Sequence, residues 1–545
     1  MSIKSPLEML YHWEKTTPDT IYLKQPVNGE YIEYSWGKTA EHARKVANQL
    51  ISLELPAGSK IAILSKNCAE WFITDLAIML AGHISVPIYS TASQSTIQYV
   101  LDHADCQAIF IGKLDKTDEQ VAAIPDSVHK FALPYPNIAA DTQWHEILLK
   151  PPYLESPVPD MDSVMTIIYT SGSTGNPKGV VHSYATICWA ARHSISQLSI
   201  SNKDRILSYL PLAHITERTL IELASFYSSA RIDFLESLET FARDVTTTKP
   251  TLFISVPRLW TRFQMGVLAN MPQKKLNLLL KLPVISNIVS KKIRTKLGLD
   301  QARLAASGSA PISVSIIQWF HKIGVDITEG WGMTENSAYG THGVPFRIDK
   351  AGSIGRAYDG VDIRIAEDGE IQVKAPCNMI EYYREPEKTA EAFTEDGYLH
   401  TGDRGTIDDE GYIKITGRLK EIFKTAKGKY IAPAPIESKL MANSIIEQIC
   451  VTGSNLKQPI ALLVLSETAE KLSNEEIKQS LLNTLTDTNN TLESHAVLDR
   501  LVVMKEQWTE KNNLLTPTLK IKRHVLEERF DDIINREMKD KVVFL

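Results

Sequence analysis

The sequence predicts an α/β protein, because two kinds of apolar segment alternate along much of the chain. Short β-branched runs at 61–65, 85–89 and 108–111 are separated by longer segments with helical spacing at 69–81 and 97–103. A second alternating region extends from 204 to 331. Strands that alternate with helices form right-handed βαβ units, so we expect a parallel sheet covered by helices.

The remaining elements follow in chain order. The first 55 residues are expected to hold one amphipathic helix, at 36–53. Residues 151–162 are rich in proline and acidic side chains, which is typical of a linker. The second alternating region predicts strands at 205–209, 252–255 and 325–327, and a helix at 313–323.

The pattern changes after Gly352 to short strands, at 363–365 and 370–373, with Gly and Asp turns between them. This indicates a smaller, mainly β subdomain. After Gly417 the chain returns to mixed α and β. A chain of 545 residues is too long for one ordinary domain and long enough for two or three.

Composition excludes several classes of protein. The hydrophobic fraction of 43% is that of a globular protein, and a net charge of -6 argues against general nucleic-acid binding. The five cysteines are far apart, so neither a zinc site nor a disulfide framework is expected. Residues 1–20 lack the apolar core of a signal peptide, and no run approaches the roughly 20 apolar residues of a membrane span. We therefore expect a cytoplasmic location.

A polar loop between two predicted strands is the first candidate site. The strand at 165–169 leads into Thr170, Ser171, Gly172, Ser173, Thr174 and Gly175, and Lys178 precedes the β-branched pair Val180-Val181. Glycines expose backbone N–H groups, hydroxyls add donors and the lysine adds positive charge, which suits the oxygens of a polyphosphate. It is not a Walker loop, because Gly179 follows the lysine. A polar hairpin loop is the alternative interpretation.

Five further motifs follow this loop in a fixed order. They are Leu210-Pro-Leu-Ala-His214-Ile-Thr-Glu-Arg218, Ala306-Ser-Gly-Ser-Ala-Pro311, Gly330-Trp-Gly-Met-Thr-Glu335, His400-Thr-Gly-Asp403 with Ile415-Thr-Gly-Arg418, and Leu515-Thr-Pro-Thr-Leu-Lys520. The set closely resembles the adenylate-forming (AMP-binding) enzymes from about residue 60 to 523. The segments after His214 and at 256–260 are most similar to those of bacterial long-chain fatty acid:CoA ligases.

The resemblance implies an adenylate-forming fold, with a large domain over 1–418 and a small, mobile α+β domain over 419–545. It also implies roles in binding ATP. Thr170 to Gly175 and Lys178 would hold the β- and γ-phosphates, Gly308, Ala310 and Pro311 would line the adenine pocket, and Trp331 with Gly332 would lie against the adenine. Thr334 would hold the α-phosphate, Glu335 would bind Mg²⁺, and Asp403 would bind the ribose hydroxyls beside Arg418.

Each of these residues also has a structural interpretation when taken alone. A tryptophan such as Trp331 often packs in a core, and a glutamate such as Glu335 is often a solvated surface charge. Asp403 also fits a turn before Gly405. His214, which the resemblance places between nucleotide and acyl group, is at a position where histidines are often structural.

The resemblance assigns catalysis of adenylation to Lys520, whose positive charge suits a reaction that brings two anions together. The alternative is a solvated basic run with Lys522 and Arg523. Thr518 and Leu519 differ from the serine or threonine and the glycine common in the family. For the second half-reaction the resemblance implies rotation about a hinge at Lys420. That rotation would bring 428–435, with Gly428, Lys429 and Tyr430, to coenzyme A.

Two segments concern the acyl substrate. Residues 253–263 resemble the family's gate and tunnel region, but Arg218 stands where some relatives have a gating tryptophan. Residues 274–292 are basic and partly amphipathic, and could lie on the inner face of a membrane. An ordinary surface helix packed by its leucines is favoured, because Pro283 interrupts the helix. Peripheral membrane contact and a homodimer stay open.

The leading hypothesis is ligation of a long-chain fatty acid to coenzyme A, with ATP, Mg²⁺ and coenzyme A as cofactor and co-substrates. One alternative is adenylation of another carboxylic acid (medium-chain or aryl) or transfer to another acceptor. A different class of protein, a catalytically silent acyl- or nucleotide-binding relative, is disfavoured by the joint presence of Lys178, Glu335, Asp403, Arg418 and Lys520.

Overall fold

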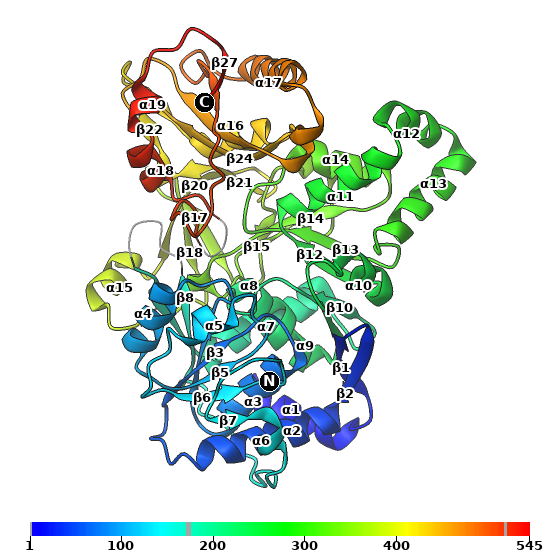
Figure 1. The fold of residues 1–545 in the computed structure, drawn as a ribbon, viewed down its shortest axis with the longest axis vertical. Helices are drawn as coiled ribbons and strands as arrows, with labels where there is room; N and C mark the ends of the chain where they lie inside the picture. Colours follow the sequence, from blue (N-terminus) through cyan, green and yellow to red (C-terminus); the bar gives the residue numbers. More distant parts are fainter. Residues whose placement is uncertain (1–2, 171–175, 517–519) are drawn as a thin grey trace.

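A computed structural model describes residues 3–170, 176–516 and 520–545. Figure 1 shows the carboxyl-terminal part of the chain, in orange and red, at one end of a much larger body. We call the residues up to Arg418 the large domain and those from Leu419 the small domain. The α/β fold class expected from the alternating apolar segments is confirmed.

The first sheet of the large domain has eight strands. Its interior pairs are parallel, as the βαβ pattern predicts, and its β8–β9 and β9–β19 pairs are antiparallel. The strands in spatial order are β19 (Glu381–Tyr382), β9 (Lys178–Ser183), β8 (Val164–Thr170), β4 (Ile84–Ile88), β3 (Lys60–Leu64), β5 (Cys106–Ile111), β6 (His129–Ala132) and β7 (Thr142–Gln143).

The second sheet of the large domain has nine strands. Parallel pairs join β1, β11, β10, β12, β13 and β14, and antiparallel pairs close both edges. The strands in spatial order are β16 (Arg356–Ala357), β15 (Thr341–His342), β14 (Ile327–Trp331), β13 (Leu304–Ser307), β12 (Leu252–Ser255), β10 (Arg205–Ser208), β11 (Arg231–Phe234), β1 (Ile21–Val27) and β2 (Glu30–Ser35).

Helices cover and separate these two sheets. They are α1 (Pro6–Thr16), α2 (Trp36–Ile51), α3 (Ala69–Leu80), α4 (Gln94–Ala104), α5 (Thr117–Val121), α6 (Trp144–Leu148), α7 (Tyr184–Leu198), α8 (Ile215–Glu217) with a π-helical turn (Arg218–Leu223), α9 (Ala224–Ser228), α10 (Phe241–Thr248), α11 (Pro257–Asn270), α12 (Gln273–Leu280), α13 (Pro283–Lys296), α14 (Val314–Lys322) and α15 (Pro386–Ala392).

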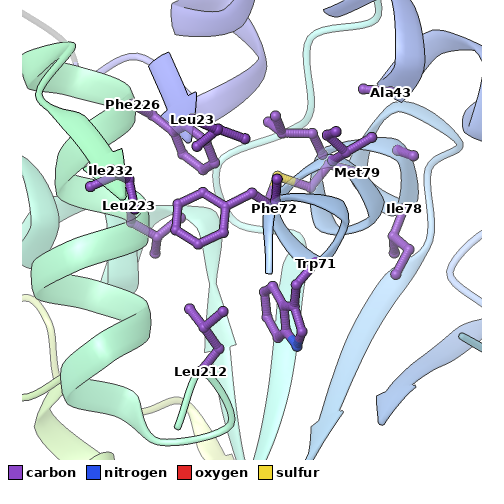
Figure 2. Close-up of a cluster of buried hydrophobic side chains, with 14 of the residues drawn as sticks. Leu23, Ala43, Trp71, Phe72, Ile78, Met79, Leu212, Leu223, Phe226 and Ile232 are labelled. Atoms are coloured by element: carbon purple, nitrogen blue, oxygen red, sulfur yellow. The ribbon is translucent and has the colours of Figure 1, made fainter. Parts of the chain in front are cut away.

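Helix α3 forms the centre of the largest core. All of its residues are buried, which explains why its sequence is apolar on every side, and it contacts β4 of one sheet and β1 of the other. In Figure 2 the Phe72 ring points toward Leu223, Phe226 and Ile232. Phe72 also meets Phe234 edge-to-face, with ring centroids 5.2 Å apart. The two sheets are therefore joined by one continuous apolar core.

The β subdomain predicted after Gly352 is a four-stranded antiparallel sheet. Its strands are β17 (Asp362–Ile365), β18 (Glu370–Lys374), β20 (Leu399–Ile407) and β21 (Ile413–Arg418). The small domain has its own core around Leu463 and Leu481. Its elements are β22 (Phe423–Lys424), β23 (Tyr430–Ile431), α16 (Pro433–Leu440), β24 (Ile446–Thr452), β25 (Ile460–Leu465), α17 (Asn474–Asn489), β26 (Leu501–Val503), α18 (Arg523–Arg529), α19 (Asp531–Asn535) and β27 (Val542–Phe544).

Two expectations about elements need correction. The first 55 residues hold two helices, α1 and α2, and the β1–β2 hairpin, which joins the nine-stranded sheet, and not a single helix. The strand expected at 325–327 is β14, which begins at Ile327 and extends through Trp331. The interruption expected at Pro283 is confirmed, because residues 274–292 are divided between α12 and α13, and Pro283 begins α13 at a position that needs no N–H donor. Across the described ranges, the helices are too short or too polar to cross a membrane.

Candidate active site

The β8–β9 hairpin carries the predicted phosphate loop. Thr170 ends β8 and Lys178 begins β9, so they are the cross-strand pair next to the loop, and the Thr170 hydroxyl donates to the Lys178 carbonyl over 3.4 Å. Ser171, Gly172, Ser173, Thr174 and Gly175, also predicted to bind phosphate, lie outside the described residues. The Lys178 ammonium lies 4.4 Å from the centroid of the Tyr382 ring. Burial lowers the pKa of Lys178, and the charge of Glu335 partly opposes this shift.

Thr334 and Glu335 lie beside this hairpin, in a 3₁₀ turn (Thr334–Asn336) after β14. The Tyr382 hydroxyl donates to Glu335 Oε1 over 2.8 Å. On the other side, His182 Nε2 donates to the Thr334 carbonyl over 2.8 Å. Burial lowers the pKa of His182 to about 4, so its ring is neutral at pH 7. Tyr382 and His182 thus fix the turn that carries Thr334 and Glu335 against β9.

Asp403 accepts hydrogen bonds from Trp331, which is predicted to lie against the adenine, and from Arg418, which is predicted to lie near the ribose. It lies in strand β20 directly opposite Arg418 of β21, so the turn interpretation of Asp403 is wrong. The Trp331 indole N–H donates to Asp403 Oδ2, and Arg418 Nε donates to Oδ1, both over 2.9 Å. Trp331 is half-buried, and its ring leaves no room for a side chain at Gly340, where a Cβ would lie 2.5 Å away. Trp331 therefore packs against the backbone and also orients the carboxylate.

The predicted adenine contacts form an open turn after β13. Ala310 and Pro311 are exposed, and the backbone of Gly308 lies against that of Gly330, so a Cβ there would be 3.3 Å from the Gly330 carbonyl oxygen. Gly332 is more restricted, because a Cβ would lie 2.6 Å from the Ala338 backbone. Small residues are required here by the close approach of backbone segments.

Lys520 reaches this site from the small domain. Its backbone N–H donates to the Thr516 hydroxyl over 3.0 Å, and its carbonyl accepts from the Thr516 N–H over 2.8 Å. The side chain is exposed, but packing around it lowers its pKa; Arg418 lowers the pKa further, and Asp403 and Glu335 oppose the shift. Arg418, Asp403 and Glu335 belong to the large domain, so Lys520 lies within electrostatic range of residues predicted to bind the nucleotide and Mg²⁺.

The neighbouring basic residues do not form a solvated run. Arg523 donates to Glu437 over 2.7 Å and to the Val451 carbonyl over 2.6 Å. Lys522 donates to Asn513 over 2.6 Å. Thr518 and Leu519, where the sequence departs from the family pattern, lie outside the described residues. A second contact between the domains is an ion pair from Arg258 of α11 to Glu447 of β24.

His214 lies at the amino end of α8, where its Nδ1 accepts the Thr216 N–H over 3.2 Å. Nε2 therefore carries the ring proton and is the available donor. Burial lowers the pKa of His214 to about 4, and the charge of Lys520 acts in the same direction. His214 thus lies within electrostatic range of Lys520 and stays neutral at pH 7.

A buried network supports the loop that carries His214. The Asn67 amide donates to Ser208 Oγ over 2.8 Å and to the Leu210 carbonyl over 2.7 Å, and it accepts the Leu212 N–H over 3.2 Å. Ser208 also donates to Glu217 Oε1 over 2.7 Å. Burial raises the pKa of Glu217 to about 8, so this carboxyl group is mostly protonated at neutral pH.

Glu217→Gln should make stability less dependent on pH. The folded pKa of Glu217 is raised above 4.5, so its contribution is fully present below that pH and is lost as the pH rises toward about 8. The amide oxygen can still accept from Ser208. We expect the variant to gain about 1.4 kcal/mol relative to wild type per pH unit in this window, measured by urea denaturation. Exposed Glu395→Gln is the control, and an equal slope for both variants would contradict the raised pKa.

Arg218, at the position of the gating tryptophan of some relatives, is fully buried. Its guanidinium donates to Asp75 over 2.8 Å, Glu222 over 3.1 Å and Ser85 over 2.7 Å. It therefore ties the π-helical turn after α8 to α3 and β4. A substitution that removed one partner would leave an uncompensated charge in the core.

The predicted hinge and coenzyme A residues lie where the chain enters the small domain. Lys420 is exposed in a 3₁₀ turn (Leu419–Glu421) between β21 and β22. Gly428 and Lys429 form the turn between β22 and β23, and Tyr430 begins β23 with 65% of its surface exposed. Lys429 and Tyr430 contact Thr425 and Lys424 of the same hairpin. This hairpin is a solvent-facing, basic projection of the small domain.

Sequence reasoning missed three residues of the site: His182, Tyr382 and Asn67. His182 directly follows the Val180-Val181 pair, and Tyr382 is half of an aromatic doublet, but neither signal indicates a partner. Their roles depend on contacts with residues more than 40 positions away.

The side chains available as metal ligands limit how the site could hold a metal ion. Within the described residues there is no group of three or more His, Cys, Asp or Glu side chains that could hold one. Glu335 has one oxygen occupied by Tyr382 and lies near Lys178. A single carboxylate beside the hairpin predicted to bind phosphate fits Mg²⁺, which is commonly held by one or two carboxylates together with substrate phosphates.

This chain belongs to the AMP-binding enzyme family, which matches residues 10–383; the family's AMP-binding enzyme C-terminal domain matches residues 421–541. Among its relatives, the long-chain-fatty-acid–CoA ligase FadD15 of Mycobacterium bovis is 30% identical, over 97% of each chain. The peroxisomal long chain acyl-CoA synthetase 6 of Arabidopsis thaliana is 28% identical, over 94% of this chain and 83% of its own.

Solved structures confirm the adenylate-forming fold. The adenylation domain of a carboxylate reductase from Mycobacterium chelonae superposes with a TM-score of 0.81 at 19% identity, covering 97% of this chain and 90% of its own. The anthranilate CoA ligase AuaEII, in complex with anthranoyl-AMP, gives a TM-score of 0.80 at 19% identity over 98% of each chain.

Proposed function

We propose that this protein ligates a long-chain fatty acid to coenzyme A through an acyl-adenylate, releasing AMP and pyrophosphate. The observation that carries the proposal is the position of Lys520, which the small domain brings within electrostatic range of Glu335, Asp403 and Arg418. A lysine whose pKa is lowered by packing, beside ionisable groups of another domain, is typical of a functional site. The fatty-acid substrate is supported by relatives named as long-chain ligases at about 30% identity over almost the whole chain.

ATP would lie along the edge formed by the β8–β9 hairpin, the Thr334 turn and Asp403. Lys178 and the hairpin would hold the β- and γ-phosphates, and Thr334 would hold the α-phosphate. Asp403 keeps acceptor capacity beyond the Trp331 and Arg418 bonds, so it could accept the ribose hydroxyls while held in place. Mg²⁺, bound by Glu335 and phosphate oxygens, would neutralise charge on the departing pyrophosphate.

In the first step, a carboxylate oxygen of the fatty acid attacks the α-phosphorus, and the bond to the bridging oxygen breaks. Pyrophosphate leaves with the electron pair. Lys520 and Lys178 would supply positive charge to this transfer, where negative charge builds up. Neutral His214 would donate its Nε2 proton in a hydrogen bond to the incoming carboxylate, orienting it without adding a second cation.

In the second step, the thiolate sulfur of coenzyme A attacks the acyl carbon, and AMP leaves with the electrons of the carbon–oxygen bond. The two transition states differ in geometry and charge, so one fixed arrangement cannot serve both. Rotation about Lys420 would withdraw Lys520 and bring the β22–β23 turn, with Gly428, Lys429 and Tyr430, to the site. The exposure of Lys420 and the separate core of the small domain support such a movement.

Acyl specificity is tested by acid-dependent ATP–pyrophosphate exchange across a series of chain lengths, with coenzyme A ester formation measured in parallel. Each buried methylene adds about 0.8 kcal/mol of favourable transfer, so efficiency should rise with length and peak at roughly twelve to eighteen carbons. Acetate and aromatic acids should be poor substrates. A maximum at acetate or at a cinnamate-like acid would contradict the long-chain assignment but not the adenylate chemistry.

Glu335→Gln should weaken Mg²⁺-dependent turnover while ATP still binds. The amide keeps the shape and the Tyr382 hydrogen bond but lacks the negative charge that a hard cation requires. We expect the Mg²⁺ concentration for half-maximal pyrophosphate exchange to rise about tenfold or more. Exposed Glu381→Gln, on the strand that carries Tyr382, is the control. Identical Mg²⁺ titrations of wild type and Glu335→Gln would rule out the ligand role.

A further inference from the structure

The hairpin of α12 and α13 has an unusual charge distribution. Between Gln273 and Lys296 it contains seven basic and no acidic residues, although the whole chain has a net charge of -6. The basic residues are Lys274, Lys275, Lys281, Lys291, Lys292, Arg294 and Lys296. None of the six lysines forms an ion pair with a described residue, so their charge is not neutralised within the described protein.

One side of this hairpin is fixed to the large domain. Leu276 and Ile293 are buried in the core around Trp260 and Phe320. The Trp319 indole N–H donates to Gln273 Oε1 over 3.0 Å, and Arg294 donates to the Ile323 carbonyl over 2.6 Å. The hairpin is therefore an ordered element with a defined inner face.

The outer side exposes aliphatic residues at the turn of the hairpin. Exposed fractions are 64% for Leu278, 44% for Leu282, 74% for Val284, 40% for Ile285 and 62% for Ile288. The favoured expectation of a surface helix packed by its leucines is thus only partly correct, because the inner leucines pack and the outer ones face solvent. In Figure 1 α12 and α13 stand out at the edge of the molecule, away from both sheets.

Helical spacing places the apolar and basic groups on the same outer faces. In α12, Lys274 and Leu278 are four residues apart, and Lys281 and Leu282 follow in the turn between the helices. In α13, Ile288 is four residues after Val284, and Lys291 and Lys292 are three and four residues after Ile288. Aliphatic groups thus gather at the turn, with exposed lysines on both sides of them. This arrangement suits a bilayer interface, where apolar side chains enter the acyl boundary and lysines meet anionic headgroups.

We propose that the α12–α13 hairpin docks this protein on an anionic lipid surface. Charge complementarity selects this occupant, because an electrically neutral apolar partner would leave seven basic groups without counter-charges. The docking goes beyond the proposed ligase activity and requires no substrate. Helices α11 and α14 share a core with the hairpin. Docking would therefore hold the large domain at the lipid surface, where long-chain fatty acids partition.

The test is cosedimentation of the full chain with vesicles of phosphatidylcholine alone or mixed with phosphatidylglycerol. Wild type should bind the anionic vesicles, and binding should weaken with added salt. The triple variant Leu278→Asp, Val284→Asp, Ile288→Asp should lose binding. The matched control is Leu149→Asp, Leu154→Asp, Val158→Asp, whose side chains are 84%, 86% and 63% exposed, and it should bind like wild type. Lys274→Gln with Lys281→Gln should bind about tenfold more weakly, and Lys15→Gln with Lys203→Gln should not.

Thermal unfolding and activity with a soluble medium-chain acid show whether each variant is folded. Equal binding to neutral and anionic vesicles, no binding to either, or equal loss in both triple variants would overturn the proposal. Light scattering measures whether wild type and the triple hairpin variant are monomers or dimers. If wild type is a dimer and the hairpin variant a monomer, a second copy of the chain covers this face, and the lipid proposal is wrong.

Discussion

Lys520→Ala should abolish formation of the acyl-adenylate while the protein remains folded. The side chain supplies positive charge beside Glu335, Asp403 and Arg418, and the fold of the small domain does not depend on it, because the backbone of Lys520 makes the hydrogen bonds to Thr516. Loss of one positioned donor or charge typically costs about a hundred- to a thousandfold in rate. Acid-dependent pyrophosphate exchange should fall by at least this factor.

The same variant should still convert a preformed acyl-adenylate to the coenzyme A ester, because Lys520 is absent from the site in the proposed second arrangement. Lys511→Ala removes an equally charged, exposed side chain from the small domain and should leave both reactions unchanged. Normal pyrophosphate exchange by Lys520→Ala would show that its assignment is wrong. Loss of the thioester step as well would show that Lys520 has a role outside adenylation.

Lys420→Pro should spare formation of the acyl-adenylate and impair formation of the coenzyme A ester, which is the reverse of the effect expected for Lys520→Ala. Lys420 lies in a 3₁₀ turn, whose usual φ of about -50 to -70° is close to the -65° that proline imposes. The present arrangement, with Lys520 at the large domain, should therefore be retained. A large change in φ at this position, which rotation of the small domain requires, should be blocked.

We expect pyrophosphate exchange by Lys420→Pro to stay near wild type and coenzyme A ester formation to fall by about a hundredfold or more. Lys420→Ala, which loses the charge but keeps backbone freedom, is the control and should support both reactions. Equal loss of both activities in the proline variant would indicate misfolding or a pivot elsewhere. Wild-type thioester formation would mean that the small domain does not turn about this residue.

Much of the site could be located from the sequence because its parts lie at the ends of predicted strands. Gly308 follows β13 and Trp331 ends β14, and these neighbouring parallel strands bring their carboxyl ends to one edge of the nine-stranded sheet. Thr170 ends β8 of the eight-stranded sheet. Local chemistry then indicated that the loop from Thr170 to Lys178 could meet phosphate, and the family resemblance assigned the metal and ribose contacts. The family resemblance supplied the order of the motifs and the role of Lys520.

The sequence could not predict how these side chains hold one another. Trp331 was expected to lie against adenine, yet its N–H orients Asp403, and Tyr382 and His182 fix the turn that carries Glu335. Each of these bonds joins segments 47 to 152 residues apart. Such pairs depend on how two sheets and a β subdomain pack, and no local periodicity encodes that packing.

By itself, the sequence determined the α/β class, the βαβ order, the β subdomain and the family, because these follow from periodicity, turn residues and contiguous motifs. The tertiary structure alone decided that Asp403 is a strand residue, that Arg218 is a buried core cation and that Lys520 lies within electrostatic range of His214. It also decided which leucines of α12 face water. Burial and electrostatic environment are properties of three-dimensional packing, since the same residue types occur at both kinds of position along the chain.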